Sequence, residues 1–135
     1  MNGMIFENKL VLDTCAFLWL VQGNSILSDD HLDTIENARV VYVSAISCWE
    51  ISLKYEQKKL TLPMEPEKWF LTALKMHSLI LVPLEITILC SANKLPVHHR
   101  DPADRFVIAT AIQEKAAVIT ADDKFLNYDI RVIKI

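Results

Sequence analysis

The chain has 135 residues, the size of one domain, and its 52% hydrophobic and 23% charged fractions exclude a disordered protein. No apolar run reaches the roughly 20 residues that a membrane span needs. The 14 basic and 17 acidic side chains leave a net charge of −3, so a nucleic-acid partner would depend on local basic patches or on bound cations.

Two features favour a cytoplasmic location without membrane association. The apolar stretch from Cys15 to Val21 is short, follows an acidic residue and lacks the basic segment of a signal peptide. The cysteines Cys15, Cys48 and Cys90 contain no C-x-x-C pair and would leave one thiol unpaired, which suits a reducing compartment. We expect them to act as small hydrophobic side chains.

In chain order, short apolar runs alternate with longer segments of helical periodicity. The apolar runs predict strands over residues 9–12, 40–43, 79–84, 117–120 and 131–135. The other segments predict a helix that starts at residue 14 and further helices over residues 28–38, 44–59, 65–77, 87–95 and 102–115. This alternation is typical of βαβ crossovers and predicts an α/β fold, with a mostly parallel sheet covered by helices on both faces.

Local signals predict how some of these helices begin and what they bury. Ser28 and Thr87 are expected N-caps, and Pro102 suits a first helical turn. The helix after Pro102 is apolar around most of its circumference and should be central. Trp49 and Trp69 lie within apolar helical patterns, so we expect both side chains in the core.

Acidic residues follow the predicted strands or open the helices after them. They come from four distant segments and are Asp13, Glu50, Asp101 with Asp104, and Asp122 with Asp123. Ligands of parallel sheets bind beyond the carboxyl ends of the strands. The acids are therefore expected to converge at that edge of the sheet.

Each acid also has a purely structural interpretation. Asp13 and Asp101 are well placed to cap the helices that follow them. Glu50 would complete a capping box with Ser47, or would lie in the second helical turn if Ser44 is the cap instead. The helix dipole or a turn would explain the remaining acids. Any one of them, taken alone, is as well explained by local structure as by chemistry.

The combination of acids favours a metal site. Four carboxylates that lie within a few ångströms of one another cannot all stay ionised without compensating positive charge. Their oxygen atoms suit Mg²⁺ or Mn²⁺ better than zinc, which prefers histidine and cysteine ligands. Such cations promote phosphoryl chemistry, because they neutralise the phosphate and activate water.

Four basic or titratable residues lie beside the acids of the central helix. His98 and His99 could provide metal-free acid–base catalysis, although a histidine in a loop is usually solvent-exposed, which is the interpretation we favour. Arg100 and Arg105 could bind a phosphate, or could pair with the neighbouring aspartates instead.

Four blocks of the sequence resemble one family. The segments "LVLDTCAFLWLV", "VYVSAISCWEISLKYEQKKLTLP", "HHRDPADRFVIATAI" and "VITADDKFLNY" are similar, in order and spacing, to those of VapC-like ribonucleases, the PIN-domain toxins of type II toxin–antitoxin systems. The similarity runs from about residue 9 to the C-terminus, which suggests one PIN-like domain over residues 1–135, with residues 1–8 as an extension.

The resemblance implies a fold, an activity and partners. The fold would be a three-layer α/β/α sandwich. The activity would be that of an Mg²⁺- or Mn²⁺-dependent endoribonuclease that cuts structured RNA, such as transfer or ribosomal RNA. The family usually forms homodimers, and a cognate antitoxin protein neutralises each toxin by covering its acidic groove.

The resemblance also assigns residues. The acidic quartet would be Asp13, Glu50, Asp104 and Asp122, in which the T-x-D spacing from Thr120 favours Asp122 over Asp123. Asp101 would be an outer ligand or only the helix cap, while Thr14 and Thr120 would support the acids. Arg100, Arg105 and His99 are candidate RNA contacts. Cys15 departs from the histidine of many relatives, so no helper role is carried over to that position.

Two other classes of function remain as alternatives. An aspartyl-phosphate phosphatase would need a second aspartate two positions after Asp13, where this chain has Cys15. A non-catalytic metal- or RNA-binding module would keep the acids without cleaving anything. Growth arrest on expression, lost in Asp13→Asn and Asp104→Asn, would distinguish an enzyme from a binding module.

Overall fold

The computed structural model describes residues 8–135, so the predicted extension lies, apart from Asn8, outside the described residues. Five parallel strands form the central sheet in the order β3-β2-β1-β4-β5. The strands are β1 (Lys9–Leu12), β2 (Val40–Ser44), β3 (Ile80–Val82), β4 (Ala117–Thr120) and β5 (Val132–Lys134). All five predicted strands are confirmed, and the sheet is fully parallel.

Alternating side chains of the two central strands build a separate core on each face of the sheet. Leu10 and Leu12 of β1 point into one core, whereas Val11 points into the other. Ile119 and Val118 of β4 divide in the same way. Both faces of these strands are apolar, as expected for a parallel sheet that helices cover on both sides.

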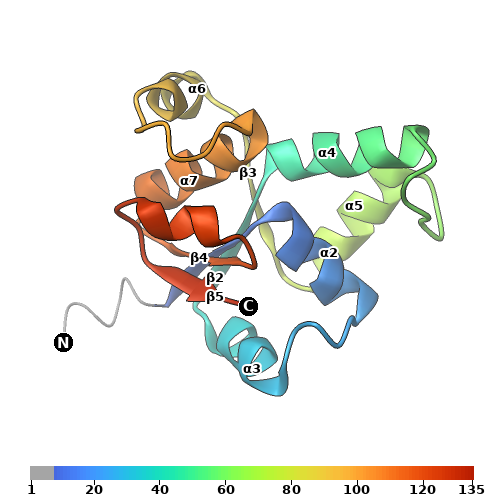
Figure 1. Ribbon diagram of the computed structural model, residues 1–135. Coiled ribbons are helices and arrows are strands. Elements are labelled where there is room, and N and C mark those ends of the chain that lie inside the picture. Colours follow the sequence, from blue (N-terminus) through green and yellow to red (C-terminus); the bar gives the residue numbers. More distant parts are fainter. Residues whose placement is uncertain (1–7) are drawn as a thin grey trace.

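Four helices cover the first face. They are α2 (Thr14–Gln22), α3 (Asp29–Asn37), α4 (Ala45–Glu56) and α5 (Pro66–Met76). Phe17 of α2 packs against Trp69 and Phe70 of α5, with ring centroids 5.6 and 5.0 Å apart. Figure 1 shows α4 and α5 extending together beyond the end of the sheet.

The second face is covered by α6 (Ile86–Asn93), α7 (Pro102–Glu114) and the short 3₁₀ helix η1 (Asp123–Asn127). Helix α7 is central, as predicted, because Val107 and Ile108 are fully buried against the sheet. Two helical layers therefore enclose one sheet, which confirms the three-layer α/β/α sandwich. Within residues 8–135, no helix has both the length and the apolarity to cross a membrane.

Local predictions about the helices are partly confirmed. Ser28 caps α3 by accepting a hydrogen bond from the His31 N–H group, as expected. Thr87 is not a cap, because Glu85 is the last extended residue and α6 begins one residue earlier, at Ile86. Trp69 is buried, but the prediction for Trp49 is wrong, since 60% of its surface is exposed.

The orientation of α4 explains the exposure of Trp49. The helix buries Ser47 and Ile51, whose relative exposures are 0% and 1%. Residues two positions apart on a helix point in nearly opposite directions, so this choice turns Trp49 and Leu53 outward. Trp49 and Leu53 therefore mark an exposed face of α4.

Candidate active site

The acidic residues gather where the strand order of the sheet reverses. The chain moves from β1 to β2 and β3 on one side, and later to β4 and β5 on the other side. Asp13 directly follows β1, and Asp122 lies just beyond its neighbour β4. Such a switch point is the usual ligand site of an open parallel sheet.

Asp13 is held by two hydrogen bonds at the end of β1. It is the N-cap of α2, and its Oδ1 atom accepts the N–H group of Ala16 at 2.8 Å. Its Oδ2 atom accepts the hydroxyl group of Thr120 at 2.6 Å. Burial raises the pKa of Asp13 above its usual value, although both hydrogen bonds act in the opposite direction.

Glu50 reaches the same edge of the sheet from the second turn of α4. Ser44 is the N-cap of this helix and accepts the N–H group of Ile46, so the alternative capping box of Ser47 and Glu50 is not formed. The Thr14 hydroxyl group donates a hydrogen bond to Glu50 and also lies 2.8 Å from the Ser47 hydroxyl oxygen. Burial raises the pKa of Glu50.

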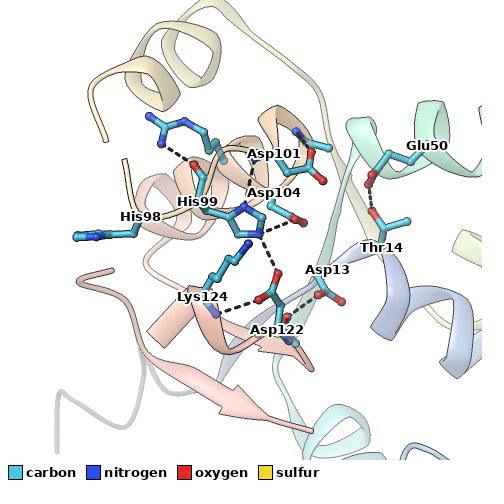
Figure 2. Close-up of polar contacts among 12 residues, drawn as sticks. Asp13, Thr14, Glu50, His98, His99, Asp101, Asp104, Asp122 and Lys124 are labelled. Carbon is cyan, nitrogen blue, oxygen red and sulfur yellow. Dashed lines mark hydrogen bonds and ion pairs between the residues drawn. The ribbon is translucent and has the colours of Figure 1, made fainter. Parts of the chain in front are cut away.

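The two aspartates of the D-P-x-D segment have different positions. Asp101 is exposed and caps α7 by accepting the N–H group of Ala103 at 3.0 Å, as predicted. Asp104 lies in the first turn of α7 and points towards Asp13 and Asp122 (Figure 2). Burial, reinforced by the negative charges of the surrounding acids, raises the pKa of Asp104 to about 8.

His99 joins two of the acids. Its Nε2 atom lies 2.9 Å from Oδ2 of Asp104 and 2.8 Å from Oδ2 of Asp122. The side chain is buried, with 5% relative exposure for the residue, so the prediction of a solvated loop histidine is wrong, whereas its role as an RNA contact stays a prediction. Burial tends to raise the pKa of Asp122, but hydrogen bonds from the Lys124 N–H group and from His99 outweigh it, and the pKa is lowered.

The four predicted acids lie within electrostatic range of one another. The charges of Glu50 and Asp122 raise the pKa of Asp13, and those three acids raise the pKa of Asp104. Figure 2 shows the carboxylates of Asp13, Asp104 and Asp122 near one another, with the Glu50 carboxylate beside them and directed at Thr14. A carboxyl group with a pKa near 8 marks a position where negative charge is poorly compensated. A divalent cation held by carboxylate oxygens would supply that compensation, so these residues fit Mg²⁺ or Mn²⁺.

The predictions for the two arginines have different outcomes. The guanidinium group of Arg105 donates hydrogen bonds to the backbone oxygens of four residues, at 2.8–3.1 Å, which are Ala92, Leu95, Pro96 and His99. Arg105 therefore holds the loop between α6 and α7 and does not pair with an aspartate within residues 8–135, while its role as an RNA contact stays a prediction. Arg100 is exposed, and its role as an RNA contact stays a prediction.

An apolar groove of about 490 Å³ begins beside the acids. Its walls are the exposed ring of Trp49 and neighbouring side chains from α4, α7 and the segment after β3, which are Ile46, Leu84, Pro102, Ala103 and Phe106. Glu50 and Asp101 line the same groove. The groove thus joins an apolar surface to the acidic cluster.

Comparison with known proteins identifies the family. The PIN domain profile matches residues 10–131, which is nearly the whole chain. The chain belongs to the PIN-domain family.

Known relatives agree with this PIN-domain assignment. Ribonuclease VapC22 of Mycobacterium tuberculosis is 29% identical over 120 residues, which cover 88% of this chain and 91% of the relative. The solved structures of VapBC2 from Rickettsia felis and VapBC from Salmonella typhimurium superpose with TM-scores of 0.70 and 0.66, at 14% and 16% identity. Each covers 93% of this chain, and the alignments span 98% and 97% of the respective matched chains. The predicted resemblance to VapC-like PIN domains is confirmed.

Two residues that were not predicted from the sequence support the site of this PIN domain. Ser47, fully buried, contacts Thr14, which in turn contacts Glu50. The hydroxyl group of Tyr128, from the loop after η1, binds the backbone of His98 and His99. The spacing of Ser47 and Glu50 on one helix was a usable signal, whereas nothing near Tyr128 in the sequence indicates its contact 30 residues away.

Proposed function

We propose that this PIN domain is a divalent-cation-dependent endoribonuclease that acts as the toxin of a toxin–antitoxin pair. Asp13, Glu50, Asp104 and Asp122 would hold Mg²⁺ or Mn²⁺. The observation that carries the proposal is the convergence of these carboxylates at the switch point of the sheet, with the pKa of Asp104 raised to about 8. The similarity to a protein named ribonuclease VapC22 supports the choice of RNA as substrate.

The side chains of the chain would hold and orient this centre. Thr120 and the Ala16 N–H group fix both oxygens of Asp13, while Thr14 directs Glu50 towards the site. The cation, when bound, would neutralise the phosphodiester and activate water for attack on phosphorus.

The substrate would be structured RNA of the transfer or ribosomal class. A net charge of −3 gives no general attraction to a polyanion, so recognition would depend on RNA shape, on the cations and on local basic groups such as Arg100. We propose that the protein acts in the cytoplasm, where such RNA is found.

A cognate antitoxin is the proposed protein partner. The apolar groove beside Trp49 would take apolar side chains of an antitoxin segment, and the acids at its end would attract a basic side chain. The similar structures from Rickettsia felis and Salmonella typhimurium are named as VapBC complexes, which supports this partner. A homodimer is proposed from the family resemblance alone.

The proposal is tested by incubating the purified chain with transfer and ribosomal RNA. We expect cleavage in Mg²⁺ or Mn²⁺ but not in EDTA, with a 5′-phosphate and a 3′-hydroxyl at the cut. Sequencing of 5′ ends after induction in cells, with Asp104→Asn as the control, would identify the sites. A 2′,3′-cyclic phosphate formed in excess EDTA would overturn the mechanism. Cation binding without cleavage would favour a binding module, and a phosphoryl group trapped on Asp13 would favour a phosphatase.

A further inference from the structure

The hydrogen bonds of His99 determine which ring nitrogen carries its proton. The backbone N–H group of Asp101 points at Nδ1 of His99, 3.2 Å away, so Nδ1 accepts. The proton of the neutral ring is therefore on Nε2. This Nε2–H group faces one oxygen of Asp104 and one of Asp122, at 2.9 and 2.8 Å, and is shared between them.

The same three side chains could be mistaken for a metal site. One donor atom each of His99, Asp104 and Asp122 lies within 4.8 Å of the others. A histidine ligand, however, needs a free lone pair on the coordinating nitrogen, and the Nε2 atom that faces the acids carries hydrogen. His99 is therefore arranged as a hydrogen-bond donor to the two acids and not as a third ligand beside them.

The loop around His99 is itself fixed. The Tyr128 hydroxyl oxygen accepts the backbone N–H groups of His98 and His99, at 3.1 and 2.8 Å, and the hydroxyl group donates to the Pro96 carbonyl oxygen. Arg105 donates to the carbonyl oxygens of Pro96 and His99. These contacts tie the loop before α7 to the loop after η1 and leave the His99 ring little freedom.

Packing holds the ring in the same orientation. The rings of His99 and Phe125 pack edge to face, with centroids 5.8 Å apart and an interplanar angle of 89°. Phe125 belongs to η1, the helix that Asp122 caps, and is fully buried. The orientation of the imidazole is thus set by η1 and by the loop before α7, the two segments whose acids it joins.

We propose that His99 is a positioning residue that draws Asp104 of α7 and Asp122 of η1 together for cation binding. Its single N–H group lies between the two carboxylates and offsets the repulsion between them. The inference deepens the proposed function and rests on it, since it assigns His99 to the same cation site.

The test compares His99→Ala with His99→Gln, whose side-chain amide can donate from a similar position. His98→Ala is the matched control, because His98 is exposed and its ring packs against Tyr128 and not against the acids. Mn²⁺ affinity is measured by electron paramagnetic resonance, and cleavage is followed as kcat and KM. We expect His99→Ala to weaken Mn²⁺ binding by about 10- to 100-fold and to lower kcat more than it raises KM. His99→Gln should recover part of both, and His98→Ala should match the wild type.

Three results would overturn the inference. One is an unchanged Mn²⁺ affinity in folded His99→Ala, and another is His99→Gln as weak as His99→Ala. The third is a directly coordinated imidazole nitrogen in the electron spin-echo signal of Mn²⁺ bound to the wild type. If His99→Ala does not fold, Tyr128→Phe tests the same loop, because it keeps the ring and removes only the hydroxyl group; a weaker Mn²⁺ affinity is expected. A wild type that binds Mn²⁺ without cutting RNA would overturn the proposed function alone, since the affinities of the variants still decide the role of His99.

Discussion

The acids that follow the strands, on the strand side of the cluster, and the acid of α7, on its helix side, differ in their hydrogen-bond partners. On the strand side, Asp13 accepts the N–H group of Ala16 and Asp122 accepts that of Lys124, so both carboxylates also begin a helix. On the helix side, Asp104 has His99 as its polar partner and no backbone N–H donor among the contacts seen in residues 8–135. The capping role in α7 falls instead to Asp101.

This difference separates acids that support the fold from an acid that would depend on a cation for the compensation of its charge. Asp122 has a lowered pKa because its hydrogen bonds outweigh burial, whereas Asp104 has a pKa of about 8. The pKa of Asp13 is also raised, because burial outweighs its two hydrogen bonds. Folding thus tolerates a carboxyl group at Asp104 that must either bind a proton or bear an unfavourable charge, which is expected of a residue kept for function and not for stability.

The largest effect is expected from Asp104→Asn. The variant keeps the shape of the side chain but loses the charge that would hold the cation, so RNA cleavage should fall by about 10³-fold or more. The metal-free protein should become more stable, by on the order of 1 kcal/mol, because an unfavourable buried charge is removed. Cleavage assays and thermal unfolding in EDTA measure the two effects.

Asp13→Ala provides the contrast on the strand side. It should also lose cleavage, but it should lower the unfolding temperature, because the cap of α2 and the bond from Thr120 are both removed. Equal stability changes in Asp104→Asn and Asp13→Ala would contradict the distinction between the two sides.

The pH dependence of stability follows from the raised pKa of Asp104. The folded-state pKa of about 8 lies above the ordinary value of 3.8, so the folded state binds more protons than the unfolded state between these values. In EDTA, the free energy of unfolding should therefore decrease as the pH rises from about 4 to about 8. Mg²⁺ or Mn²⁺ should raise the unfolding temperature more at pH 8 than at pH 5, where the cation must displace protons.

Thermal unfolding in EDTA across this pH range tests the prediction, with Asp104→Asn as the control. The decrease between pH 4 and pH 8 should be smaller in the variant than in the wild type. Profiles of the same slope in both proteins would show that Asp104 is not the group responsible.

A smaller effect is expected from Thr14→Val, which removes the hydroxyl group between Glu50 and Ser47 at nearly constant volume. Groups that orient a metal ligand typically contribute about 10- to 100-fold to metal affinity or activity. We expect a loss of cleavage in this range, with the fold retained. Thr87→Val, on the exposed surface of α6, is the matched control and should cleave like the wild type.

Most of the fold and the convergence of the acids could be predicted from the sequence. Strands with apolar side chains on both faces and helices of clear periodicity can be predicted from local sequence patterns alone. A parallel sheet then places the carboxyl ends of its strands at one edge. The predictions that were wrong depend on tertiary choices. The sequence does not determine which face of α4 is buried, and in the structure Ser47 and Ile51 are buried while Trp49 is exposed. Arg105 was expected near phosphate or aspartate, but it donates to the carbonyl oxygens of Ala92, at the end of α6, and of Leu95, in the loop that follows.

The burial of His99 also could not be predicted from the local sequence. Its contacts with the two acids arise because the loop before α7 folds back onto η1, through Tyr128 and Phe125, which are distant in sequence. The sequence around His99 therefore predicts only a loop residue just before the start of a helix. Only the packing of two segments buries it between carboxylates.

The smallest effect is expected from Asp101, and it separates the two aspartates of α7. Asp101→Ala should cost about 1 kcal/mol of stability through the lost cap, whereas Asp101→Asn should cost only a few tenths, because asparagine caps equally well. Both variants should keep cleavage within a few-fold of the wild type. Asp101 raises the pKa of Asp104 and Glu50 through its charge alone, so its loss should make the site slightly easier to ionise. A folded Asp101→Asn as inactive as Asp104→Asn would place Asp101 among the cation ligands.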